Sequence, residues 1–328
     1  MKTFARPQVV VSRCLGFEAC RYNGVTIPDT FVEALSRHVT YVTTCPEVQI
    51  GLGVPRDPIR VVVVDGEPRL MQPASGRDVT EQMRTFAEEF FNGLEYVDGF
   101  ILKGRSPSCG IKDVRRYRAE VGKDGKQSVI DKTGLGIFGS MVKARYPQLP
   151  IEEEGRLTNF VIREHFLTAL FTLASFRAVK VAGSVGSLVE FHSNNKLLLL
   201  AYNESQLRKM GPVVANPDKK AAGDVIAIYE AHLWQALARP PRTTTAINVL
   251  MHALGYFSEK LSSEEKAFFL DSLERYRERK VPLSVPLNLM GAWIVRFDEP
   301  YLARQTFFAP YPEELITISD SGKGRDLR

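Results

Sequence analysis

The first half of the chain alternates short runs of β-branched residues with segments of helical spacing, and this alternation limits the possible folds more than any other feature. The pattern predicts strands at residues 9–11, 39–44, 59–64 and 99–103, and helices at 28–37 and 80–94. Strands and helices in alternation form parallel β-α-β units. The sequence therefore predicts an α/β fold with an N-terminal parallel-sheet, Rossmann-like domain over residues 1–155.

The pattern changes after Gly155. Residues 156–316 have mainly helical spacing and are predicted as an all-α C-terminal domain, with loops at 212–217, 240–245 and 281–286. The clearest helix covers 261–280, where Ser262 and Glu265 have the spacing of a capping box. The polar residues 317–328 are predicted to form a flexible tail.

The composition is that of an ordinary globular protein. With 44% hydrophobic and 25% charged residues, a collagen-like, coiled-coil or mainly disordered chain is excluded. The net charge of +5 permits an anionic partner without requiring one. No apolar run approaches the roughly 18 residues of a membrane span. We therefore expect no membrane contact, and the absence of a secretion signal predicts a cytoplasmic location.

Cys14, Cys45 and Cys109 each come at or shortly after the end of a predicted strand. Because the carboxyl ends of parallel strands share one edge of a sheet, where ligands bind, we expect these thiols to converge. Four cysteines are too few for a disulfide scaffold, so they are reduced thiols, metal ligands or catalysts. No pair has C-x-x-C spacing, and buried unreactive thiols remain an open alternative.

Short motifs surround these cysteines. In chain order they are Val10-Val-Ser-Arg-Cys-Leu-Gly with Cys20-Arg-Tyr-Asn-Gly24, then Cys45-Pro-Glu47, Ser106-Pro-Ser-Cys-Gly110 and Gly134-Leu-Gly-Ile-Phe138. Together they resemble the thiouracil desulfidase family. The resemblance implies a 4Fe-4S cluster bound by Cys14, Cys45 and Cys109 as its metal ligands, and it leaves Cys20 outside the ligand set. Arg13 and Asn23 depart from the family pattern, which bears on substrate preference.

The resemblance also implies the reaction. Thiolated uracil compounds such as thiouracil or 4-thiouridine monophosphate would lose their sulfur as hydrogen sulfide, without net redox change. Three protein ligands leave one iron open as a Lewis acid for a thiocarbonyl sulfur. The catalytic candidates are Glu47, as the base for water, and Ser106, which would position the substrate or relay a proton. The alternatives are a loop ion pair for Glu47 and a helix N-cap for Ser106.

Basic residues near the same edge favour a phosphate-bearing substrate over the free base. Arg21, Lys103 and Arg105 are the candidates for contact with a substrate phosphate. Further basic residues follow at Lys112, Arg115, Arg116 and Arg118. A solvated run of charge is the alternative.

Two other functions remain open at this stage. The second half resembles an uncharacterised helical domain often fused to desulfidases, and its basic helices make contact with tRNA or dimerisation conceivable. The first alternative is accordingly a tRNA-binding module with a structural metal site. The second is a zinc hydrolase that uses the same three thiols.

Overall fold

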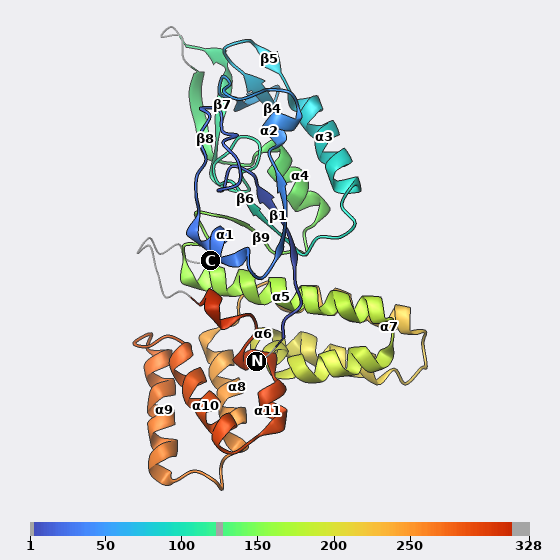
Figure 1. Cartoon of the computed structure of the whole chain (residues 1–328), viewed down its shortest axis with the longest axis vertical. Coiled ribbons are helices and arrows are strands. Elements are labelled where there is room, and N and C mark those ends of the chain that lie inside the picture. Colours follow the sequence, from blue (N-terminus) through green and yellow to red (C-terminus); the bar gives the residue numbers. More distant parts are fainter. Residues whose placement is uncertain (1–2, 123–126, 317–328) are drawn as a thin grey trace. The chain divides into compact units, whose positions relative to one another are not determined.

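The structure is a computed structural model that describes residues 3–122 and 127–316 (Figure 1). The chain divides into two compact units, one of residues up to 174 together with those from Pro312, and one of Ser175–Tyr311. The last described strand is β9 (Ile151–Glu153), and the long helix α5 (Phe160–Ala182) follows it. The predicted tail at 317–328 lies outside the described residues.

A parallel sheet of four strands lies in the first unit. Its order is β2 (Thr40–Thr44), β1 (Gln8–Ser12), β6 (Gly99–Leu102) and β9. The central strand β1 is flanked on both sides, because Val10 pairs with Val42 in β2 and with Phe100 in β6. Helix α1 (Thr30–Leu35) connects β1 to β2 and begins at Asp29, whose side chain caps it. The predicted α/β class is thus confirmed.

A second sheet, which the sequence pattern did not predict, completes the β structure of this unit. It contains β5 (Arg77–Asp78), β4 (Glu67–Gln72), β3 (Arg60–Val64), β7 (Val114–Val121) and β8 (Gln127–Gly134), in that order. The strand expected at 59–64 exists, but it belongs to this sheet, where it pairs antiparallel with β4 and parallel with β7. Asp65 and Gly66 have φ of 49° and 85° and form the tight turn between β3 and β4.

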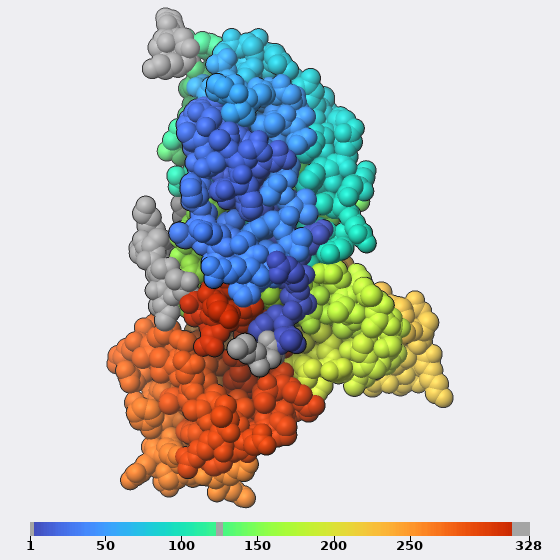
Figure 2. All heavy atoms as spheres, in the orientation of Figure 1, coloured from blue at the N-terminus to red at the C-terminus, as the bar shows by residue number. Residues whose placement is uncertain are grey.

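One hydrophobic core supports the loops of this unit. It joins residues of both sheets to helices α3 (Thr80–Asn92) and α4 (Ile137–Arg145), which lie beside each other in Figure 1. Phe138 of α4 is fully buried, with its ring centroid 5.5 Å from that of Phe91 in α3. Cys109 and Ile111 belong to the same core, so the loop after β6 is packed against it. In Figure 2 the N-terminal segments of this unit, in shades of blue, pack against one another on the face in view.

The second unit is helical, as predicted. It holds the end of α5, then α6 (Val185–Ala215), α7 (Ala222–Leu237), α8 (Thr243–Gly255), α9 (Ser263–Arg277), α10 (Ser284–Arg296), α11 (Pro300–Arg304) and the 3-10 turn η1 (Thr306–Phe308). The capping box at α9 is confirmed, since Ser262 and Glu265 exchange both bonds, at 3.1 and 2.8 Å. The prediction of a loop at 212–217 is wrong at its start, because α6 continues to Ala215. The helix ends at Asn216, whose backbone is left-handed, with φ 43°.

The expectation that no segment has the length and apolarity of a membrane span needs correction. By length and composition, α5 passes that test, with a mean hydropathy of 1.2 over 18 residues. However, 61% of that window is buried inside the protein, as in the core helix of a globular protein. Charged residues such as Arg163 and Arg177 interrupt the apolar sequence and concealed the pattern.

His165 on α5 should make folding stability depend on pH. Burial lowers the pKa of its imidazole from 6.5 to about 4. A lowered folded-state pKa means that the contribution of neutral His165 is complete above pH 6.5 and is lost as the pH falls toward 4. We expect the free energy of unfolding in urea to decline more steeply over this range in the wild type than in His165→Gln. Equal slopes in the two proteins would contradict this assignment.

Candidate functional site

Three of the four cysteines lie just beyond the ends of neighbouring parallel strands. Cys14 follows β1, Cys45 follows β2 directly, and Cys109 lies in the loop after β6. These strands are adjacent in the sheet, so their loops share its carboxyl edge. Cys45 is also the N-cap of the short helix α2 (Pro46–Gln49). All three are buried free thiols.

The surroundings of Cys14 and Cys109 affect the ionisation of these two thiols. Burial, together with a smaller effect of the neighbouring Cys45 and against the opposing effect of Lys103, raises the pKa of Cys14 from 9.0 to about 11. Burial also raises the pKa of Cys109, with added effects from Glu47, Cys45 and Cys14. Cys14 and Cys109 therefore lie in an electrostatic environment that raises their pKa values and favours their neutral forms. Ionisation of several of them together requires a compensating positive charge such as a metal.

Cys20 lies in the same environment and in the same loop after β1 as Cys14. Burial raises its pKa to about 12, and Cys45 and Cys14 contribute, Cys45 also through a side-chain hydrogen bond. The Cys45 thiol in turn donates to the backbone carbonyl of Cys20 at 3.8 Å. The structure thus brings four thiols together, three from the loops after β1 and β6 and one directly after β2.

Glu47 is fixed at both carboxylate oxygens. Its Oε2 accepts two hydrogen bonds from Arg56, from Nη2 at 2.7 Å and from Nε at 2.9 Å. Its Oε1 accepts from Ser108 Oγ at 2.6 Å and from Ser106 Oγ at 3.5 Å. The two charged side chains are only 13% and 4% exposed, for Glu47 and Arg56 respectively. The ion pair considered from the sequence is present, and it leaves Oε1 directed at the loop of Cys109.

Two serines connect this carboxylate with Cys109. The hydroxyls of Ser106 and Ser108 are 2.9 Å apart, and that of Ser108 lies 3.7 Å from Cys109 Sγ. Ser106 Oγ also accepts from the backbone N–H groups of Ser108 and Cys109, at 3.3 and 3.2 Å, which is a capping contact. The two serines are the link between Glu47 and the Cys109 side of the site.

Sequence reasoning missed Ser108 and Arg56. Ser108 is fully buried and stands directly before Cys109 in the third motif, so its place in that motif was an available signal. Arg56 lies in a Gly/Pro-rich loop and had no signal beyond its charge. It also donates to the carbonyls of Cys20 and Gly53, at 3.0 and 2.9 Å, and so joins the loops that carry Cys20 and Glu47.

The glycines of the fourth motif support the Cys109 loop. The N–H of Gly136 donates to the carbonyl of Gly110 at 2.7 Å, and that of Gly139 to the carbonyl of Ser108 at 2.9 Å. A Cβ at Gly136 would lie 2.4 Å from Ser108 O, and one at Gly139 would lie 2.5 Å from Cys109 O. Only residues without a Cβ permit this approach of two backbones.

Two carboxylates of the β9 region hold the ends of the same loop. Glu153 Oε1 accepts from the N–H groups of Ile111 and Lys112, at 2.8 and 3.1 Å. Glu154 Oε2 accepts from the N–H of Gly104 at 2.7 Å. The burial of Glu153 raises its pKa. The loop is thus fixed at both ends and beneath its centre.

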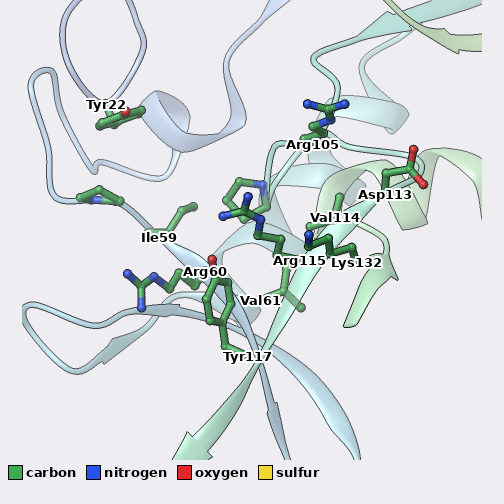
Figure 3. Close-up of a pocket in the computed structure, with 12 residues that line it drawn as sticks. Tyr22, Ile59, Arg60, Val61, Arg105, Asp113, Val114, Arg115, Tyr117 and Lys132 are labelled. Atoms are coloured by element: carbon green, nitrogen blue, oxygen red, sulfur yellow. The ribbon is translucent and has the colours of Figure 1, made fainter. Parts of the chain in front are cut away.

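The three candidates for contact with a phosphate make different contacts. Lys103 forms an ion pair with Glu154. The Arg21 guanidinium lies 5.5 Å from the ring centroid of Tyr22. Arg105 is exposed, has a left-handed backbone with φ 60°, and lines a pocket of about 730 Å³ (Figure 3).

Within residues 3–122 and 127–316, no three His, Cys, Asp or Glu side chains are spaced to bind a single ion. In an iron-sulfur cluster each thiolate binds a different iron, so the ligands surround an inorganic core instead of meeting at one point. Buried thiols at three adjacent strand ends fit this second pattern.

Comparisons with known proteins divide the chain in two. Residues 9–154 match the family model described as 2-thiouracil desulfurase, and residues 196–312 match that of a protein of unknown function (DUF1722). The uncharacterized protein YbgA of Escherichia coli (strain K12) is 29% identical over 158 residues, which cover 48% of this chain and 93% of YbgA.

A second relative, the uncharacterized protein YbbK of Bacillus subtilis (strain 168), is 35% identical over 109 residues, or 31% of this chain and 72% of YbbK. Among solved structures, the 4Fe-4S-dependent thiouracil desulfidase TudS aligns at 25% identity with a TM-score of 0.35. That alignment covers 46% of this chain and 93% of TudS.

The close approach at Gly136 can be tested by substitution. We expect Gly136→Ala to lower the free energy of unfolding by about 1–3 kcal/mol, as overpacking usually does, because the new methyl group would meet Ser108 O. Gly155→Ala is the matched control, since a Cβ there meets nothing within 4 Å. Urea unfolding of the full chain measures both. Equal stability of the two variants would show that the contact does not constrain the loop.

Proposed function

Because this chain belongs to the 2-thiouracil desulfurase family, we propose that it hydrolyses the carbon–sulfur bond of thiolated uracil compounds with the help of a 4Fe-4S cluster. The substrates are thiouracil and 4-thiouridine monophosphate. Water replaces sulfur at the thiocarbonyl carbon, which becomes a carbonyl, and hydrogen sulfide leaves, so no electrons are gained or lost. The observation that carries the proposal is that Cys14, Cys45 and Cys109 meet at one sheet edge beside Glu47.

Cys14, Cys45 and Cys109 would hold the cluster, and Cys20 would remain outside its ligand set. When bound, the cluster supplies an iron without a protein thiolate, which is a Lewis-acid position for the thiocarbonyl sulfur. The four free cysteines also support the proposed cytoplasmic location.

Glu47 is the proposed base for the attacking water. Its Oε2 is occupied by Arg56, while Oε1 is the oxygen that faces the serines. A carboxylate held in this way needs no reorientation to accept a proton. Ser106 would position the substrate or pass the proton toward the departing sulfur, and Ser108 would orient Glu47 from the Cys109 side. Contact of tRNA with the helical region stays a prediction.

The ligand assignment predicts a difference among the cysteines. We expect Cys14→Ala, Cys45→Ala and Cys109→Ala, purified without oxygen, to lose the visible absorbance of the cluster and the release of sulfide from 4-thiouridine monophosphate. Cys20→Ala should keep both, because the family resemblance leaves Cys20 outside the ligand set. Iron and acid-labile sulfide analysis of all four proteins is the measurement. A Cys20→Ala protein without iron, together with iron in any of the other three, would overturn the assignment.

Glu47→Gln should separate catalysis from cluster binding. The amide keeps the size of the side chain but cannot accept the proton, so we expect the kcat for sulfide release to fall on the order of 10²- to 10⁴-fold, with iron content unchanged. Glu33→Gln, on the exposed face of α1, is the matched control. Wild-type turnover in Glu47→Gln would remove Glu47 as the base.

A further inference from the structure

A pocket of about 730 Å³ lies in the first unit, between the second sheet and the loop that carries Cys109 (Figure 3). Its volume is in the range of about 300–1,000 Å³ that small-molecule sites occupy. The wall is formed by the loop before β3, by β3, β7 and β8, and by the loop after β6. Ile59 and Val61 give it an apolar floor.

The pocket carries more positive than negative charge. Its basic side chains are those of Arg60, Arg105, Arg115 and Lys132, against one carboxylate, that of Asp113. Within the described part of the chain, none of these four forms an ion pair with a carboxylate. Two nearby cations outside the pocket do form ion pairs: Arg116 with Asp131 at 2.5 Å, and Lys103 with Glu154. Such a group of free cations in a concave site attracts an anion.

The contacts of β7 and β8 separate these paired and unpaired cations. Arg115 and Tyr117 of β7 line the pocket, and so does Lys132 of β8. Arg116 does not line it and pairs instead with Asp131, its register partner on β8. The pairing of the two strands is irregular here, with register shifts on both sides of Arg116. The cations of this hairpin therefore have different surroundings, an ion pair at Arg116 and the pocket at Arg115 and Lys132.

Two tyrosines add surfaces for a flat ring. The Arg60 guanidinium lies 4.7 Å from the ring centroid of Tyr117, and Tyr22 is 43% exposed at the opposite wall. Exposed aromatic rings stack on nucleobases, and guanidinium groups bind phosphate through paired hydrogen bonds. Cations and aromatic rings together in one pocket are the chemistry of a nucleotide site.

The pocket adjoins the proposed catalytic loop. Arg105 and Pro107 line it and stand four and two residues before Cys109. We propose that this pocket binds the phosphate of a thiolated uridine nucleotide, with Arg115 and Lys132 as its principal cations and Arg105 at the side of the thiols. This inference rests on the proposed desulfidase function. The phosphate is either that of a free mononucleotide or that of an RNA strand.

The test compares substrates with and without phosphate. In holoenzyme carrying Arg115→Ala and Lys132→Ala, we expect the ratio of kcat/KM for 4-thiouridine monophosphate to that for 4-thiouracil to fall about tenfold or more. Arg118→Ala with Lys143→Ala removes two exposed cations that do not line the pocket, and it should keep the wild-type ratio. A wild-type ratio in the pocket variant overturns the proposal.

Direct binding separates failure of the pocket from failure of the proposed function. If no substrate releases sulfide, the desulfidase function fails, and the pocket is judged by equilibrium dialysis with uridine monophosphate and uridine. We expect the wild type to bind uridine monophosphate more tightly than uridine and the pocket variant to lose that preference.

A short single-stranded RNA, added as competitor at two salt concentrations, identifies the source of the phosphate. Competition that the pocket variant loses assigns an RNA strand, and its absence assigns the mononucleotide. Equal binding of uridine monophosphate and uridine by the wild type overturns the assignment of this pocket as a phosphate site.

Discussion

The adjacency of β2, β1 and β6 in one parallel sheet determines where this protein can do chemistry. The hydrogen-bonded register sets Val42, Val10 and Phe100 side by side, although they are far apart in the sequence. Each strand therefore delivers its following loop to the same edge, where these loops carry Cys14, Cys45 and Cys109, and the loop after β1 carries Cys20 as well. The core beneath these strands is fully buried, so the register cannot shift without exposing it.

The loop of Cys109 shows how backbone contacts complete what the sheet begins. A strand end alone fixes only the first residues of a loop, but α4 approaches this loop through its glycines, and Glu153 holds the loop's far end. The buried pair of Glu47 and Arg56 does the same for the neighbouring loops. Removal of either partner would leave an unpaired buried charge, which is costly. The side chains and loops of the site are therefore held in place by contacts within the protein itself.

The sequence predicted the features that depend on local pattern. Strands β1, β2 and β6 of the first sheet and the capping box at Ser262 are of this kind, whereas the short strand β9 was missed. The second sheet was missed because β7 carries Arg115, Arg116 and Arg118 close together, which resembles a solvated run of charge, and because its partner β8 is also polar. The proximity of Cys20 to Cys45 and the contact of Arg56 with Glu47 depend on irregular loops, whose path no periodicity specifies.

The same missed hairpin changes the interpretation of the basic residues. In the sequence alone, Arg115, Arg116 and Lys132 are three basic residues among many, and nothing indicates which of them is paired with a carboxylate. The β7–β8 register gives each a different surrounding, since it pairs Arg116 with Asp131 and leaves the other two facing the pocket. A phosphate held there and a thiocarbonyl held at the thiols would fix a nucleotide at two points. Binding energy from the non-reacting phosphate can then orient the reacting carbon, which increases the rate instead of only the affinity.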